Sequence, residues 1–386
     1  MTTSRLYLDH AATTPVRPEV VDAMLPYFSR YGYNPSSTHA EGRAARAALD
    51  DARERVARVL GCKPKEIVFT GSGTEADNLA ILGVAGALGR RGSILTTRIE
   101  HHAVLHAVER LRDEGHTLTL LEVDSAGCVD PAAFGAALRD DTLLASVMYA
   151  NNEIGTVQPI AELARATHAR GALFFSDAVQ APGQLPLDVD ELGVDLLAIS
   201  AHKFYGPKGI GALYVREGTP LAPQLLGGGQ EYGRRSGTEN VAEIVGLATA
   251  LELAEAERPS AAPRVAALRD RLERSILERI PEVRINGREG ARLSNNLSVS
   301  FAGLDAEPLL IRLDLEGVAA SAGSACAAGS LEPSHVIAAL GASQRSARGT
   351  IRFSLGRTTT PEEVDRFAAL LPALVAGQRE AAPVSV

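Results

Sequence analysis

Short apolar runs recur through the first two thirds of the chain, separated by segments of helical character. Each run has the length of a buried strand. The predicted strands are Glu66–Thr70, Ser93–Thr97, Thr117–Val123, Leu143–Tyr149, Leu173–Ser176, Val194–Ser200 and Gly211–Val215. A long helical segment, Glu41–Leu60, is amphipathic. Because strands and helices alternate with short connections, this pattern predicts an α/β fold in which helices cover a mostly parallel sheet.

The last third of the chain has shorter predicted elements. Its strands include Val283–Asn286, Asn296–Phe301 and Thr350–Ser354. A helix is expected around Glu307–Glu316. Upstream, Arg258–Pro263 contains two prolines and predicts a break, or at least a bend, in a helical segment that otherwise runs from about Glu239 to Arg279.

Composition and charge exclude several classes of protein. The 386 residues are 45% hydrophobic and 22% charged, which is ordinary for a globular chain long enough for two domains. The net charge of −8 gives no electrostatic reason to bind nucleic acid or an anionic membrane. We find neither an apolar run of about 18 residues nor the apolar core of a signal peptide. The cysteines, Cys62, Cys128 and Cys326, have no CxxC spacing, which argues against a disulfide framework or a zinc site and favours the reducing cytoplasm.

Polar side chains gather at the carboxyl ends of the predicted strands. They are His101, Asn152, Asp177, Gln180, Ser200, His202 and Lys203. Each one alone could be a turn residue or a helix cap. In open α/β sheets, however, ligands bind beyond these strand ends, so the shared position indicates a binding site.

Lys203 directly follows one of these buried strands. An isolated lysine there would be read as a surface residue. A lysine held among small residues against a desolvated wall has its ammonium form disfavoured, and its amine becomes a nucleophile. That is the requirement for an imine-forming lysine.

A glycine-rich turn, Gly71–Gly73, leads from a predicted strand into a helix. Backbone N–H groups and the helix dipole make such a turn a candidate anion site, and Thr74 is expected as its N-cap and as a hydroxyl donor to a phosphate. The turn matches neither the P-loop nor the GxGxxG pattern. Asn34, followed by Pro-Ser-Ser, has the chemistry of a plain turn.

The segment Ser200–Gly209 resembles the pyridoxal-phosphate lysine segment of the class V aminotransferase family. Further segments look like the rest of that family's cofactor site: Gly73–Asn78, Glu100–Val104, Asn151–Gly155, Asp177–Gln180 and Arg234–Asn240. Ser321–Cys326 and Ile351–Arg357 narrow the resemblance to cysteine desulfurases of the NifS/IscS group. These motifs occur in order from Leu8 to about Thr360.

The resemblance implies the pyridoxal-phosphate-dependent transferase fold of type I. A large α/β domain with a mostly parallel seven-stranded sheet would span residues 16–257. A smaller α/β domain, built from residues 1–15 and 258–386, would carry the catalytic cysteine loop. The resemblance also implies a homodimer, L-cysteine as substrate, and delivery of sulfur for iron–sulfur cluster assembly or for thiolation of tRNA or cofactors.

It further implies a role for each candidate residue. Lys203 would hold the cofactor and move protons, Asp177 would keep the ring nitrogen protonated, and His101 would stack on the ring and assist proton transfer. Gln180 and Asn152 would bond the ring oxygen or the substrate. The phosphate would be bound at Gly73, Thr74, Ser200 and His202, with Thr238 reaching in from the other subunit. Arg352 would bind the substrate carboxylate through its guanidinium fork, Asn34 would lie near the substrate, and Arg357 would be structural.

Cys326 would attack the substrate sulfur and then present a persulfide to an acceptor. Every other residue from Ser321 to Ser330 is Ser, Ala or Gly, which suits a loop that moves. Cys62 and Cys128 are read as small buried hydrophobic residues. No intrinsic metal site is expected, although Cys326 is a candidate for a transient iron–sulfur ligand shared with a scaffold protein.

Alternative functions remain open at this point. Another class V aminotransferase would not need a cysteine in a flexible loop, whereas a selenocysteine lyase would use much the same site. A cofactor-free interaction protein that only scaffolds cluster assembly would not need Lys203, Asp177 and Cys326 together. The chain ends soon after its last predicted helix, without the longer tail that helps the IscS subgroup to dock a scaffold protein. This favours a NifS-like or tRNA-sulfur role.

Overall fold

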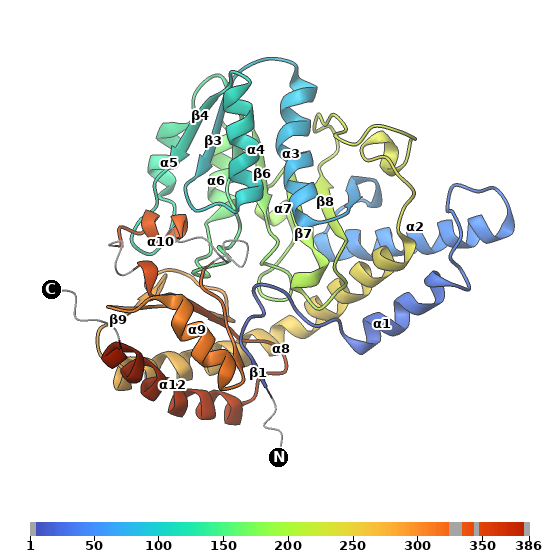
Figure 1. Cartoon of the computed structure of the whole chain (residues 1–386). Helices are drawn as coiled ribbons and strands as arrows, with labels where there is room; N and C mark the ends of the chain where they lie inside the picture. The colour runs from blue at the N-terminus through green and yellow to red at the C-terminus, as the bar shows by residue number, and fades with distance from the viewer. Residues whose placement is uncertain (1–4, 324–333, 343–346, 382–386) are drawn as a thin grey trace.

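A computed structural model describes residues 5–323, 334–342 and 347–381. A seven-stranded sheet dominates it, with the strand order β2-β8-β7-β6-β5-β3-β4 (Figure 1). Its strands are β2 (Ile67–Thr70), β3 (Ser93–Thr97), β4 (Thr117–Leu121), β5 (Thr142–Ser146), β6 (Leu173–Asp177), β7 (Leu196–Ser200) and β8 (Gly211–Val215). Six of these strands run in the same direction, and β8 runs opposite to them, between β2 and β7. The predicted fold class, with a mostly parallel sheet, is confirmed.

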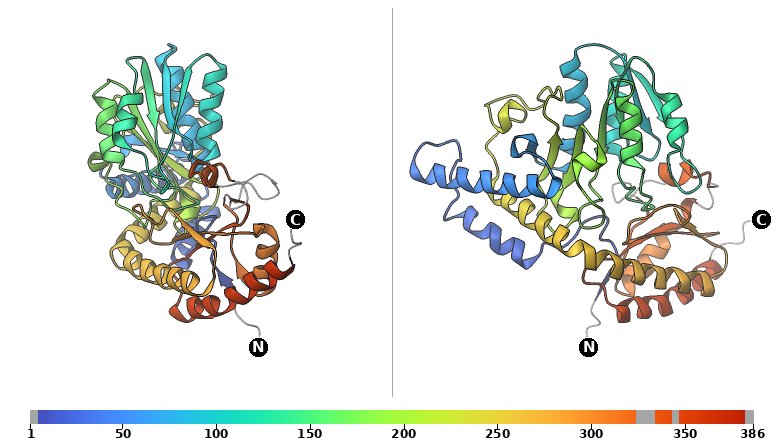
Figure 2. Two further views of the ribbon diagram at one scale, coloured as in Figure 1. Left: turned by 90° about the vertical axis from the view of Figure 1, so that its left-hand side faces the viewer. Right: turned by 180° about the vertical axis from the view of Figure 1, so that it is seen from behind.

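Helices cover both faces of this sheet, as the edge-on view in Figure 2 shows. On one face, α3 (Gly73–Leu88) and α4 (His102–Asp113) share a core with the sheet. The helices of the other face are α2 (Ala40–Leu60), α5 (Pro131–Ala137), α6 (Ile160–His168), α7 (Val189–Leu192) and the first part of α8 (Val241–Arg279). Apolar residues therefore fill both sides of the strands, which explains why the strands are almost continuously hydrophobic.

A separate hydrophobic core joins the chain's beginning to its last third. It contains a three-stranded antiparallel sheet of β9 (Val283–Asn286), β10 (Asn296–Phe301) and β12 (Thr350–Ser354). The second half of α8, α9 (Ala306–Leu315) and α12 (Pro361–Ala381) pack on it, and β1 (Leu6–Tyr7) pairs in parallel with β11 (Val318–Ala319). A further short helix, α10 (His335–Ala339), lies between β11 and β12 in the chain.

The sequence predicted a break, or at least a bend, at Arg258–Pro263, and the break does not occur. The helix α8 continues from Val241 to Arg279 with Pro259 and Pro263 inside it, and in Figure 1 it runs from beneath the large sheet to the smaller unit. Each proline removes one N–H donor, and the packing of both halves of α8 in the two cores stabilises the helix across that loss. Near the N-terminus, α1 (Pro18–Met24) is followed directly by the 3-10 helix Leu25–Phe28.

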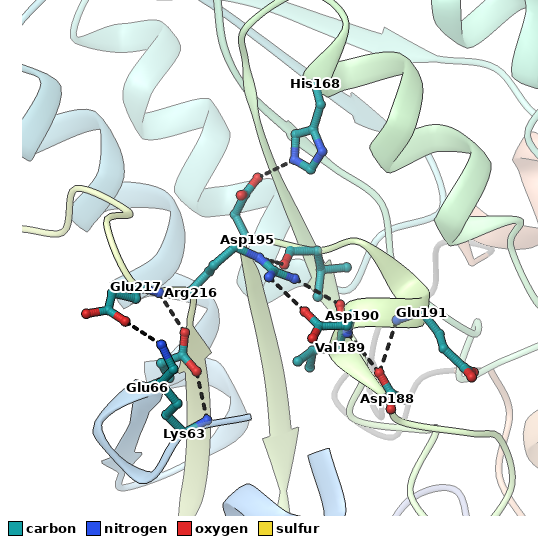
Figure 3. Close-up of polar contacts among 11 residues, drawn as sticks. Lys63, Glu66, His168, Asp188, Val189, Asp190, Glu191, Asp195, Arg216 and Glu217 are labelled. Atoms are coloured by element: carbon teal, nitrogen blue, oxygen red, sulfur yellow. Dashed lines mark hydrogen bonds and ion pairs between the residues drawn. The ribbon is translucent and has the colours of Figure 1, made fainter. Parts of the chain in front are cut away.

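The parallel strands of the large sheet all begin at the same end of the sheet, which is called its amino edge below. Several charged side chains at this amino edge are paired with one another (Figure 3). Arg216 follows β8 and donates to Asp190 Oδ1 and to the carbonyl oxygens of Val189 and Val194. Asp195, which precedes β7, accepts from Phe174 N at 2.7 Å and pairs with His168 Nε2 at 2.8 Å. These contacts tie the ends of neighbouring strands together on the side away from the candidate site.

None of the helices in the described ranges is long and apolar enough to cross a membrane.

Candidate active site

Lys203 lies in the 3-10 turn Ala201–Lys203, directly after β7. Its Nζ donates to the carbonyl oxygens of Ala11 and Ala12 at 2.7 and 2.8 Å. Gln180, in the turn after β6, donates from Nε2 to the same Ala11 oxygen at 3.1 Å. The turn after β1 therefore brings the lysine and the glutamine together at the carboxyl edge of the sheet.

Asp177 is the last residue of β6 and is 6% exposed. Its Oδ1 accepts from Val179 N at 2.9 Å. Burial raises the pKa of this carboxyl to about 6, whereas the Val179 hydrogen bond and the charge of Lys203 act in the opposite direction. A cation beside Asp177 favours its ionised form. This carboxylate can thus hold a proton on a neighbouring ring nitrogen.

Two histidines at this edge are kept neutral. Burial, and then the charge of Lys203, lower the pKa of His101 and of His202 to about 4. His101 is the N-cap of α4 and accepts from Ala103 N through Nδ1. His202 Nδ1 lies 3.1 Å from Thr13 Oγ1. At neutral pH both rings are therefore uncharged, which suits stacking by His101 and hydrogen bonding by His202.

The first turn of α3 packs against the end of β7. A Cβ at Gly73 would lie 3.1 Å from Ser200 Cβ and 2.9 Å from Val179 Cγ2, so this approach requires glycine. Ser72 is the N-cap and accepts from Glu75 N at 3.1 Å, so the expectation that Thr74 would be the cap is wrong. The helix starts at Gly73, which leaves Thr74 exposed in the first turn, where helix N–H groups favour anions.

Arg352 on β12 is 1% exposed and reaches the turn after β5 of the large sheet. It donates to Asp9 Oδ1 at 2.9 Å and to the carbonyl oxygen of Asn152 at 2.8 Å. Its Nε is buried without a hydrogen-bond partner. An arginine held between a carboxylate and a carbonyl is positioned to exchange Asp9 for another carboxylate. Arg357 instead donates its backbone N–H to Tyr205 Oη, and its Nε lies 3.6 Å from Glu257 Oε2.

Two of the predicted residues that the structure describes, Asn34 and Thr238, stand apart from this group. Asn34 is exposed on the loop between the first 3-10 helix and α2, which projects away from the sheet in Figure 1, and its Oδ1 accepts from Ser36 N. Thr238 is exposed in the segment before α8, a segment that Arg235 ties to Glu75 at the start of α3. Cys326 lies outside the described residues.

The sequence interpretation missed Asp9 and the carbonyl groups of Ala11 and Ala12. The run Leu8-Asp9-His10 does place a lone acid after a strand, but its partner Arg352 is 343 residues away. Backbone carbonyls have no residue signature at all. Contacts of this kind become visible only when the fold brings the chain's two ends together.

Pyridoxal phosphate fits the residues that are present. The group needs an amine, a carboxylate for the ring nitrogen, a donor for the ring oxygen and a cup for the phosphate. Lys203, Asp177 and Gln180 lie at one edge of the sheet. Because residue 73 is glycine, the first turn of α3, with its unpaired N–H groups, can pack close to Ser200.

Comparisons with known proteins agree with this geometry. The model of the family "Aminotransferase class-V" matches residues 6–367. Cysteine desulfurase IscS of Dictyoglomus turgidum is 49% identical over 379 residues, covering 98% of this chain and 96% of the relative. Cysteine desulfurase IscS of Methanosarcina thermophila is 48% identical over 381 residues, with coverage of 98% and 94%.

Solved structures show the same relationship. A NifS-like protein has a TM-score of 0.91 and 38% identity, covering 97% of this chain and 100% of the neighbour. SspA in complex with cysteine has a TM-score of 0.82 and 38% identity, with coverage of 92% and 100%. The chain belongs to the class V aminotransferase family. Within that family it belongs to the cysteine desulfurases, which depend on pyridoxal phosphate. The resemblance found in the sequence is confirmed.

Proposed function

We propose that this chain converts L-cysteine to L-alanine and receives the substrate sulfur on Cys326 as a persulfide. The observation that carries the proposal is the convergence of Lys203, Gln180 and Asp177 at the carboxyl edge of the sheet. When bound, pyridoxal phosphate supplies an electron sink for carbon acids. The chain's own residues hold it and manage the protons.

The residues divide this work by position. Lys203 provides the covalent attachment, Asp177 holds the proton of the ring nitrogen, and the neutral His101 ring stacks and passes protons. Gln180 and Asn152 bond the ring oxygen or the substrate. The phosphate is held by the first turn of α3 and by three further side chains at that end: Thr74, Ser200 and His202.

Arg352 binds the substrate carboxylate in exchange for Asp9. The two guanidinium nitrogens that now contact Asp9 and the Asn152 carbonyl have the fork geometry that matches a carboxylate. Nε, which is buried and without a hydrogen-bond partner, is available for a further bond. Asn34 is also proposed to lie near the substrate.

The atoms and electrons of the sulfur transfer come from the Cys326 thiol and the substrate alone. The Cys326 thiolate attacks the substrate sulfur, an S–S bond forms, and the Cβ–S bond breaks with its electron pair kept by carbon. A proton delivered through Lys203 then completes the methyl group of alanine. The substrate sulfur is oxidised and Cβ is reduced, so no outside oxidant is required.

The proposal extends to the assembly and its partners. A homodimer would let Thr238 reach the phosphate of the partner subunit's site, and its exposed position supports this role. The division into domains is part of the proposal, with residues 16–257 in the large domain and residues 1–15 and 258–386 in the small one, and the separation of the two hydrophobic cores supports it. The sulfur acceptor would be an iron–sulfur scaffold protein, with Cys326 as a transient shared ligand, or a tRNA thiolase in the cytoplasm.

The test is the variant Cys326→Ala, purified with its cofactor. It should retain the cofactor absorbance and lose alanine and persulfide production from L-cysteine. Unchanged turnover would contradict the role of Cys326. Comparing kcat/KM for cysteine and selenocysteine in the wild type separates a desulfurase from a selenocysteine lyase.

A further inference from the structure

Glu153 is a buried acid that the proposed chemistry does not use. It follows Asn152 in the turn after β5 and is 1% exposed. Asn151 fixes this turn, because its Oδ1 accepts from the backbone N–H groups of Glu153 and Ile154, at 2.8 and 3.0 Å, and its Nδ2 donates to the Ile99 carbonyl. The carboxyl of Glu153 is therefore held at a defined point.

Its contact lies 181 residues further along the chain. Ser334 Oγ donates to Glu153 Oε2 at 2.5 Å. The same hydroxyl oxygen accepts from Val336 N at 3.1 Å and caps α10. Next to it, His335 Nε2 lies 2.9 Å from the Glu100 carbonyl oxygen. Glu153 thus fixes the start of α10 against the carboxyl edge of the large sheet.

Gly323 approaches the same carboxyl from the other direction along the chain. A Cβ at Gly323 would lie 2.9 Å from Glu153 Oε2 and 3.4 Å from Ser334 Cβ, and its φ of +58° also favours glycine. Gly323 and Ser334 flank residues 324–333, which include Cys326. Both flanking residues therefore lie beside the Glu153 carboxyl, Ser334 through a hydrogen bond and Gly323 through the close approach of its backbone.

The segment before Gly323 is fixed to the substrate arginine. Ser321 and Arg352 exchange two backbone hydrogen bonds, at 2.7 and 3.3 Å. Burial raises the pKa of Glu153, while the Ser334 hydrogen bond and the charges of His335 and Arg352 act to lower it. The positive charge of Arg352 is therefore close enough to Glu153 to favour the ionised form of its carboxyl.

Covalent geometry makes this arrangement relevant to Cys326. Only Ser324 and Ala325 separate Gly323 from Cys326 along the sequence, so very little chain connects the two positions. The position of Gly323 consequently limits where the thiol can act. From Ser334 the limit is far looser, because seven residues intervene.

We propose that Glu153 is a positioning residue for sulfur transfer, which fixes both flanks of the Cys326 segment beside Arg352. This inference rests on the proposed role of Cys326. It assigns Glu153 no contact with substrate or cofactor. Its loss should therefore impair the transfer of sulfur to the thiol and leave the earlier binding of L-cysteine intact.

The experiment compares holoenzyme variants Glu153→Ala, Glu153→Gln and Ser334→Ala with the wild type. We expect E153A to lower the rate of Cys326 persulfide formation by about 10- to 100-fold, because small misplacements of a reacting group have effects of this size. KM for L-cysteine and the cofactor's spectral change on adding L-cysteine should persist. E153Q should recover most of the rate, since its amide oxygen still accepts from Ser334 Oγ. S334A should show a smaller loss than E153A.

Glu66→Ala is the matched control. Glu66 is also a buried carboxyl, but it lies at the amino edge, where it accepts from Lys63 N and Glu217 N. E66A should lower the Tm without changing the persulfide rate.

Persulfide formation at the wild-type rate in E153A would overturn the inference, as would an equal loss in E66A at equal Tm. If E153A does not fold, a wild-type rate in S334A overturns it. Cys326→Ala is measured alongside: activity in C326A contradicts the proposed function, whereas an inactive C326A with a normal E153A contradicts only the role of Glu153.

Discussion

The two edges of the seven-stranded sheet handle charge in opposite ways. At the carboxyl edge, burial raises the pKa of Asp177 to about 6 and that of Glu100 to about 8, and it lowers the pKa of His101 to about 4. At the amino edge, Asp195 and Arg216 are joined to neighbouring side chains and backbone groups (Figure 3).

Unsatisfied polar atoms follow the same division. Glu100 Oε2 and Asp77 Oδ1, near the carboxyl edge, are buried without a hydrogen-bond partner. No labelled residue of Figure 3 has such an atom. Buried groups with displaced pKa values are unfavourable for stability but useful for chemistry. We infer that the carboxyl edge is built for cofactor chemistry and the amino edge for stability, and substitutions can test this division.

The largest expected effect is that of Asp177→Asn. Loss of the ring-nitrogen partner should lower kcat/KM by about 10²- to 10⁴-fold, the range for a displaced proton-handling group. The free energy of unfolding of D177N, in contrast, should be higher than that of the wild type at neutral pH. The folded pKa of about 6 exceeds the ordinary value of 3.8. The carboxyl's contribution to stability is therefore complete below pH 3.8 and is lost as pH rises through 6.

At pH 7 the ionised carboxyl thus lowers the free energy of unfolding of the cofactor-free protein, by an amount on the order of 3 kcal/mol. D177N should be more stable than the wild type at pH 7, with the difference vanishing towards pH 4. Urea unfolding at both pH values measures it. Asp195→Asn is the matched control and should lose stability while keeping activity. A destabilised D177N would remove the basis of the comparison.

Arg216→Met tests the amino edge, and its expected effect is of intermediate size. The variant removes hydrogen bonds to Asp190 and to the Val189 and Val194 carbonyls, so the free energy of unfolding should fall by about 1–3 kcal/mol. Cofactor affinity and kcat/KM should stay at wild-type values, because Arg216 lies at the opposite end of β7 and β8. A loss of activity without a loss of stability would show that the edges are not independent.

The smallest effect is expected for Glu217→Gln. Glu217 pairs with Lys63 and Lys65 on the surface, and these partners lower its pKa to about 2. Exposed pairs of this kind are screened by salt and contribute little. Melting curves of E217Q and the wild type should coincide at physiological ionic strength, and a clear difference at high salt would show that this pair is more than a surface contact.

The alternation of apolar runs was enough to predict the sheet, because strands buried on both faces are nearly continuous in sequence. The sequence also predicted that Asp177, Ser200 and Lys203 lie at one edge of the sheet, because parallel strands end at the same edge. Sequence could not show that the helix α8 passes through Pro259 and Pro263, since packing at both ends of the helix decides this.

Other features depend on contacts between distant parts of the chain. The sequence predicted Thr74 as the N-cap of α3. In the structure the N-cap is Ser72, because the helix begins two residues earlier than predicted. Asp9 meets Arg352, and Glu153 meets Ser334, only in the folded chain. Acids and hydroxyls are common, so no local pattern identifies such pairs.

The most direct test of the central claim is reduction of the holoenzyme with borohydride, followed by peptide mass spectrometry. The account predicts that the cofactor's mass appears on Lys203, that neighbouring Lys208 carries none, and that Lys203→Ala abolishes the labelling while the protein stays folded. Labelling of another lysine, or wild-type turnover in K203A, would contradict it.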